Sequence, residues 1–186
     1  MKEKLKELYT KEEISADGLM KAVTQGWITT EEAAEILAGN VPEEEQEQAK
    51  LPIYRAAKLA EISAACNATI LAGVDVELSD GTTGHFSLQE TDQINLTTAY
   101  NAVQMGAAGY PYHADGEICK LYSAEDIVTI GDAATAFKLY HLTYCNHMMA
   151  WARRAETAEE LATIVYGVDL PEDLAANMAE VMTNAG

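Results

Sequence analysis

The spacing of apolar residues in this chain changes from a helical period to strict alternation at Val74. From Val74 to Leu88 apolar and polar residues alternate, apart from the interruption Ser79-Asp80-Gly81-Thr82-Thr83-Gly84. Alternation is typical of strands with one buried face, and a Gly-containing interruption is typical of a hairpin turn. A hairpin alone is marginally stable in water, so its apolar face must pack on helices. The sequence therefore predicts a mainly α (α+β) fold with one β-hairpin at about 74–88.

Residues 1–39 carry the start and stop signals of short helices. Thr29 and Glu32 have the spacing of a capping box, in which each side chain accepts a hydrogen bond from a backbone N–H group at the helix start. Gly26 and Gly39 stand where helices are expected to end, because glycine readily adopts the conformation that follows a last turn. The sequence therefore predicts a small N-terminal helical pair.

Trp27 and Ile28 directly follow a helix-ending glycine and form an apolar plug between the two predicted helices. A unit of about 30 residues buries little of its own surface, so it covers two large apolar side chains poorly. We therefore expect Trp27 and Ile28 to bind a partner protein or a second copy of the chain. A buried tryptophan often anchors such an interface.

Residues 40–50 are polar and acidic, and Pro42 introduces them. They are expected to form a linker or a solvated lead-in to a helix. Residues 51–186 are predicted to form a helical domain packed on the hairpin. Its expected helices run from Pro52 to Gly73, from Thr91 to Gly106 and from Ser123 to about Glu156, and two more begin at Thr157 and at Pro171. Gly131 favours a break in the third of these helices. Residues 106–122 are expected to form a loop.

The chain contains 30 acidic and 12 basic residues, which gives a net charge of −18. Such a charge repels phosphate groups, so we expect neither nucleic acid nor an anionic membrane surface as a partner. No run of about 18 apolar residues predicts a membrane span. The three cysteines lie far apart, and the start Met1-Lys2-Glu3 is not typical of a signal peptide. We therefore expect synthesis and folding in a reducing cytoplasm.

The segment from Tyr110 to Gly116 is the richest in chemically versatile side chains, with Tyr110, Tyr112, His113 and Asp115 close together. It could be a ligand-binding loop, or half of a metal site. It could also be an ordered loop whose polar side chains satisfy backbone groups. We favour the structural interpretation because buried polar groups in proteins are generally paired.

His141 and Cys145 lie one helical turn apart, a spacing that can hold Zn²⁺, but His147 points to another side of the same helix. The alternative interpretation is a metal- or small-ligand-binding module, with hydrolase chemistry as one use. Its site would be built from His113, Asp115, His141 and Cys145. A cysteine within an apolar helix is usually inert packing, and the chain has no phosphate-binding or dinucleotide motif. We expect no enzyme activity, no catalytic residue, no metal and no cofactor.

Two parts of the chain resemble known families. Residues 10–39, through Gly26-Trp27-Ile28-Thr29 and the acidic pair that follows, resemble the XkdX family of phage and prophage proteins, which are encoded beside tail-fibre genes. Residues 55–156 resemble a domain of unknown function found on phage tail-fibre proteins. The segments that carry this second resemblance are Ile62 to Cys66, Gly81 to Phe86, Asp92 to Leu96, Tyr110 to Gly116, and Trp151 to Arg154.

These resemblances imply a bacteriophage protein of the tail, baseplate or tail-fibre region, made in the bacterial host and carried in the virion. They imply structural partners in that assembly, and a homo-oligomer or another symmetric arrangement. They bring no catalytic residues to this chain. A tail-fibre assembly chaperone that is absent from the finished particle is a further alternative.

Overall fold

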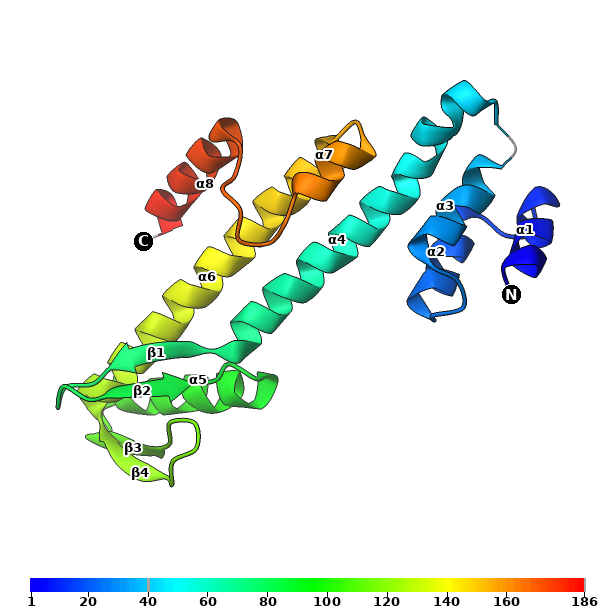
Figure 1. Cartoon of the computed structure of the whole chain (residues 1–186). Helices are drawn as coiled ribbons and strands as arrows, with labels where there is room; N and C mark the ends of the chain where they lie inside the picture. The colour runs from blue at the N-terminus through cyan, green and yellow to red at the C-terminus, as the bar shows by residue number, and fades with distance from the viewer. Residues whose placement is uncertain (40, 186) are drawn as a thin grey trace. The chain divides into compact units, whose positions relative to one another are not determined.

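The computed structural model describes residues 1–39 and 41–185 (Figure 1). The helices are α1 (Lys2–Thr10), α2 (Ala16–Thr24), α3 (Thr30–Ala38), the 3-10 helix η1 (Glu43–Glu45), α4 (Gln46–Ala72), α5 (Glu90–Gln104), α6 (Ala124–Arg154), α7 (Ala158–Thr163) and α8 (Glu172–Ala185). The strands are β1 (Val74–Glu77), β2 (Thr83–Phe86), β3 (Gly109–Tyr112) and β4 (Lys120–Ser123). The predicted fold class, mainly α with a β-hairpin, is confirmed.

Backbone contacts divide the chain into two compact units. The first contains residues 1–64 and 145–181, and the second contains residues 65–144 and the residues from Met182 on. The three transitions, after residues 64, 144 and 181, fall within the helices α4, α6 and α8. Of the predicted linker at 40–50, Asn40 lies outside the described residues, and the remainder contains η1 and the start of α4. The division at this linker stays a prediction.

The first unit begins with three short helices, and side chains cap the starts of the second and third, α2 and α3. The Thr29 hydroxyl accepts a hydrogen bond from the N–H group of Glu32 at 3.1 Å, and the Glu32 carboxylate accepts one from the N–H group of Thr29 at 3.0 Å. This is the predicted capping box of α3. Ser15 caps α2 by accepting a hydrogen bond from Gly18.

A small apolar core joins these three helices to the start of α4. Leu19, Ala33 and Ala34 are fully buried in it, and Ile53 of α4 is 1% exposed in the same cluster. The predicted helical pair is therefore part of a larger apolar cluster to which the long helix contributes. This contribution explains how so short a segment buries its apolar residues.

Within the same unit, side chains at the end of α6 bind α8. The guanidinium group of Arg154 donates two hydrogen bonds to the carboxylate of Asp173, and this ion pair lowers the pKa of Asp173 to about 2. Nε2 of the buried His147 lies 2.9 Å from Oδ1 of Asn177. The pairing connects His147 of α6 to α8.

The second unit contains two antiparallel hairpins. In the first, Val74 of β1 pairs with Phe86 of β2, as the alternating pattern predicts. In the second, Gly109 of β3 pairs with Ser123 of β4, within the segment that was predicted to be a loop. The prediction of a loop is wrong. Gly109 and Pro111 weaken the strand signal in the local sequence, but tertiary packing determines the conformation here.

The turn from α4 into β1 depends on a glycine. Gly73 has a φ of +93°, and a Cβ atom at this position would lie 2.1 Å from the carbonyl oxygen of Phe86. Only glycine combines this left-handed backbone with so close an approach of the neighbouring strand.

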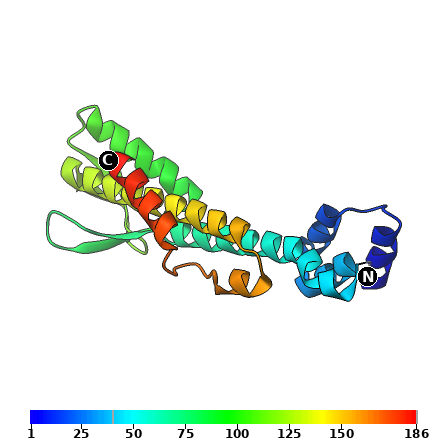
Figure 2. The same ribbon diagram turned by 90° about the horizontal axis from the view of Figure 1, so that it is seen from above.

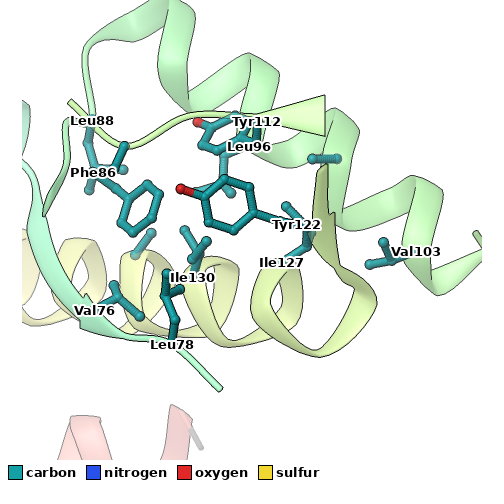
Figure 3. Packing of buried hydrophobic residues seen from close by; sticks show 13 residues of the cluster. Val76, Leu78, Phe86, Leu88, Leu96, Val103, Tyr112, Tyr122, Ile127 and Ile130 are labelled. Atoms are coloured by element: carbon teal, nitrogen blue, oxygen red, sulfur yellow. The ribbon is translucent and has the colours of Figure 1, made fainter. Parts of the chain in front are cut away.

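A core of aliphatic and aromatic side chains holds both hairpins against α5 and α6 (Figure 3). The Phe86 ring stacks on Tyr112 with a centroid separation of 6.3 Å and meets the edge of Tyr122 at 6.1 Å. Ile127 and Ile130 of α6 are fully buried in the same cluster. Burial raises the pKa of Tyr112 to about 12, because the phenolate is poorly solvated there.

Replacing Gly73 by alanine should lower the free energy of unfolding by about 3 kcal/mol or more, because the methyl group meets backbone atoms. Gly106 is the matched control: its φ is +101°, but a Cβ atom there would meet nothing within 4 Å. Gly106→Ala should cost only about 1 kcal/mol of backbone strain. Urea unfolding of both variants measures the difference, and equal losses would contradict this account of the turn.

Candidate functional site

A cleft of about 420 Å³ lies between α5 and α6 in the second unit. Figure 2 shows α5 next to the first part of α6, and in the view of Figure 1 the two helices diverge from the start of α6. Leu88, Leu96 and Ala134 provide apolar walls, and polar side chains stand among them. A mostly apolar concavity with a few polar groups is the usual form of a binding site.

One end of the cleft is built around Gly131 of α6. The ring of Tyr100 lies against this residue so closely that a Cβ atom would be 2.3 Å from Cδ2 of the ring. The Tyr100 hydroxyl donates a hydrogen bond of 2.9 Å to the carboxylate of Asp132. The sequence favoured a break of the helix at Gly131, but α6 is continuous. Glycine serves here to make room for the ring.

The other end of the cleft is built around Lys138. Its ammonium group donates a hydrogen bond to Oε1 of Gln93 on α5. Because Gln93 pairs with Lys138 and Tyr100 pairs with Asp132, the two helices run antiparallel. Asp132 and Lys138 are six residues apart, or about 9 Å along the helix axis. The cleft therefore carries an anion at one end and a cation at the other.

Asp115, in the segment 110–116, makes two hydrogen bonds to the first hairpin and the residue that follows it. The N–H group of Asp115 donates a 2.8 Å hydrogen bond to the carbonyl oxygen of His85. The Asp115 carboxylate accepts one of 3.2 Å from the N–H group of Ser87. Asp115 thus connects the second hairpin to the strand β2, as expected for an ordered segment whose side chains satisfy backbone groups.

Some residues of this segment also line a second, smaller pocket. It has a volume of about 220 Å³ and includes Tyr110, Tyr112, His113 and the exposed Cys119, together with residues of α5. The imidazole of His113 stacks on the ring of Tyr112 at 5.8 Å. Asp115 does not line this pocket, so the predicted set is divided between the pocket and the junction of the hairpins.

The alternative set His113, Asp115, His141 and Cys145 is not brought together as one cluster. In residues 1–39 and 41–185, no three His, Cys, Asp or Glu side chains are grouped so that they could hold a metal ion. His141 and Cys145 lie on α6, and the ring of Phe137 meets His141 at 4.4 Å. Burial lowers the pKa of His141, because the charged imidazolium is poorly solvated.

His85 forms a charged connection that sequence reasoning missed. Its Nδ1 lies 2.6 Å from Oδ1 of Asp75, and its Nε2 lies 2.7 Å from the carbonyl oxygen of Ala72 at the end of α4. A carbonyl oxygen and a carboxylate only accept, so both ring nitrogens donate when the imidazole is protonated. The hydrogen bond to Asp75, with that to Ala72 second, raises the pKa of His85.

The two apolar residues of the predicted plug have different environments. Trp27 is 56% exposed, whereas Ile28 is 6% exposed in the core of the first unit. Ile28 precedes the capping residue Thr29, a position from which an apolar side chain packs back on its own helix. Partner binding by these two residues stays a prediction, and of the pair it is the exposed Trp27 that offers its side chain to a partner.

The fold and these sites define a mainly helical domain in which two hairpins and an antiparallel helix pair share one core. A family model for a domain of unknown function, DUF4376, matches residues 53–166, more than half of the chain. The chain therefore belongs to the DUF4376 family. No curated protein and no solved structure matches the chain. No helix within the described ranges 1–39 and 41–185 is long and apolar enough to cross a membrane.

Sequence reasoning also missed the α5–α6 cleft, although one signal for it was present. Gly131 stands within a helical pattern, and Asp132 and Lys138 follow it. A glycine in such a position indicates that a neighbouring element approaches the helix closely. The partner residues on α5 could not be assigned without the tertiary fold, because Gln93 and Tyr100 lie more than 30 residues away along the chain.

The charged form of His85 should stabilise the second unit in a pH-dependent manner. Because its folded pKa is raised, this stabilisation is fully present below the unfolded pKa, about 6.5. It is lost as the pH rises through the folded value. NMR titration of the ring should show the raised pKa, and Asp75→Asn should return it toward the ordinary range. A His85 that titrates at or below about 6.5 would contradict the connection.

Proposed function

We propose that this protein is a structural interaction protein of a bacteriophage tail, baseplate or tail-fibre region, which binds other proteins and catalyses no reaction. The proposal is supported by the resemblance of residues 10–39 and 55–156 to tail-associated families. The structural observation that carries it is the exposure of Trp27 beside a well-packed core.

Trp27 has the properties of an interface anchor. Its indole is 56% exposed, while Leu19 and Ala33 of the adjoining helices are fully buried. The backbone on which it stands is fixed: Gly26 has a φ of +68°, and the N–H group of Trp27 donates to the carbonyl oxygen of Ala22 at 2.9 Å. Exposing an indole costs free energy that a partner recovers by covering it, and tryptophan is enriched among residues that dominate binding.

The charge of the chain supports a protein partner over a nucleic acid. A net charge of −18 opposes contact with phosphate backbones. The same charge makes two copies of the chain repel each other at long range. Association therefore depends on short-range contacts such as an apolar anchor.

A tail-fibre assembly chaperone would use the same anchor but would leave the finished particle. Particle composition separates this alternative from a structural component. Mass spectrometry of purified tails should find the protein in stoichiometric amounts, and its absence from complete particles would favour the chaperone.

Trp27→Ala should release the protein from its partner without unfolding it. Truncating a central tryptophan commonly weakens an interface by 2 kcal/mol or more, about 30-fold in Kd. Because the side chain is exposed, the free energy of unfolding should change by less than about 0.5 kcal/mol. Purified tails from phage that encode the variant should lack the protein.

Two controls define this experiment. Ile28→Ala truncates the neighbouring core residue and should lower the free energy of unfolding by about 2–5 kcal/mol. Met105→Ala truncates a side chain of the second unit that is 88% exposed and should change neither stability nor incorporation. Incorporation of Trp27→Ala at the wild-type level would refute Trp27 as the attachment residue.

A further inference from the structure

The strand β4 pairs with β3 on one side, and no strand that the structure describes pairs with its other side (Figure 1). We propose that β4 pairs antiparallel with β4 of a second copy across a two-fold axis, so that the two hairpins form one four-stranded sheet. This surface is separate from Trp27. The inference therefore goes beyond the proposed function, and the two are tested independently.

The main chain of Leu121 faces this open edge. Hydrogen-bonded and non-hydrogen-bonded pairs alternate along an antiparallel ladder. Pro111, which lies opposite Leu121, has no N–H group, and the N–H group of Ala124 donates to the carbonyl oxygen of Ala108 at 3.1 Å. The hydrogen-bonded pairs therefore fall on the even-numbered residues of β4, such as Tyr122. The N–H and C=O groups of Leu121 point away from β3 and are available to another strand.

The side chains at this edge are apolar and exposed. Leu121 is 76% exposed, and Ile118 in the turn before β4 is 87% exposed. On β1 of the first hairpin, in contrast, both exposed side chains are acidic. Charged side chains protect a strand edge from pairing, whereas an exposed apolar edge favours it. The single charged side chain of β4, Lys120, forms an ion pair with Glu117 of the same hairpin at 3.2 Å.

The low charge around β4 is the reason to expect a second copy as the partner. The chain has a net charge of −18, so most of its surface repels another copy. Residues 93–114, which include most of α5 and all of β3, contain no Asp, Glu, Lys or Arg. Residues 115–123 contain two acidic residues and one basic residue, which is a net charge of −1. Two copies can therefore meet here with little repulsion.

Charge also selects the register of the pairing. If Leu121 lies opposite Leu121 of the second copy, Lys120 lies opposite Tyr122, and no like charges meet. Within one copy the ammonium group of Lys120 lies over the Tyr122 ring, 5.0 Å from its centroid, so the two side chains are compatible neighbours. The next symmetric register would place Lys120 opposite Lys120 of the second copy, which is destabilising. The two-fold axis therefore passes between the two Leu121 residues, as in an isologous dimer.

Disulfide cross-linking of the full-length protein tests the pairing and its register. Leu121→Cys, in a Cys119→Ser background, should form a disulfide-linked dimer under mild oxidation, because the Cα atoms of a hydrogen-bonded pair lie about 5.5 Å apart. Ile118→Cys in the same background is the control. Ile118 is more exposed than Leu121, but in this register its two copies are offset by six residues, or about 20 Å. The control should therefore form no linked dimer.

Charge at the two-fold axis provides a second test. Leu121→Lys should weaken association about 10-fold or more, because two ammonium groups then meet across the axis. Met105→Lys is the matched control, since it adds the same charge at an apolar residue of the second unit that is 88% exposed. The control should associate like the wild type. Sedimentation over a range of concentrations measures association, and thermal unfolding should show that both variants keep the wild-type stability.

Three results would overturn the pairing of β4. One is a wild-type protein that stays monomeric at all concentrations tested. Another is equal cross-linking of the two cysteine variants, and the third is equal weakening of association by Leu121→Lys and Met105→Lys. Tail incorporation of Trp27→Ala tests the proposed function whichever of these results is obtained.

Discussion

Phe86 lies where the two hairpins of the second unit meet, and its surroundings impose much of the local structure. Its ring contacts Tyr112 of β3 and Tyr122 of β4 (Figure 3). Its carbonyl oxygen requires glycine at position 73, and a Cβ atom on Gly84 would lie 3.0 Å from its ring. Two-stranded hairpins are marginal in water, so each is stable here because it shares this core with the other and with two helices. The walls of the cleft depend on the same core, since Leu88 and Leu96 belong to both.

The parts of the fold that local chemistry encodes could be predicted from the sequence. The alternation of apolar and polar residues predicted the first hairpin, and the spacing of Thr29 and Glu32 predicted the start of α3. The second hairpin could not be predicted, because Pro111 argues locally against a strand and only tertiary packing overrides it. The cleft had only the signal of Gly131 within a helical pattern, and its α5 side could not be predicted because the hydrogen bonds across it join residues distant in sequence. Trp27 and Ile28 are adjacent large apolar residues, so the sequence does not distinguish them. Only the packed core shows that Ile28 is buried and Trp27 is exposed.

Polar side chains of the second unit are used to connect its secondary-structure elements. Asp115, one of the most chemically versatile residues in the sequence, is used to join hairpins, and His85 ties β2 to the end of α4. The surface also carries an exposed tryptophan, Trp27, and the cleft between α5 and α6. A strongly acidic surface disfavours partners that are themselves acidic, so a binding surface on this chain depends on close complementarity.

If Trp27 is the anchor, its indole becomes buried when the protein binds its partner, and its fluorescence measures this burial directly. Trp151→Phe removes the other indole, so that all tryptophan emission comes from Trp27. As the protein joins purified tails, the emission should shift to shorter wavelength and acrylamide quenching should fall. A tail-bound protein whose Trp27 emits and is quenched as in the free protein would contradict the account.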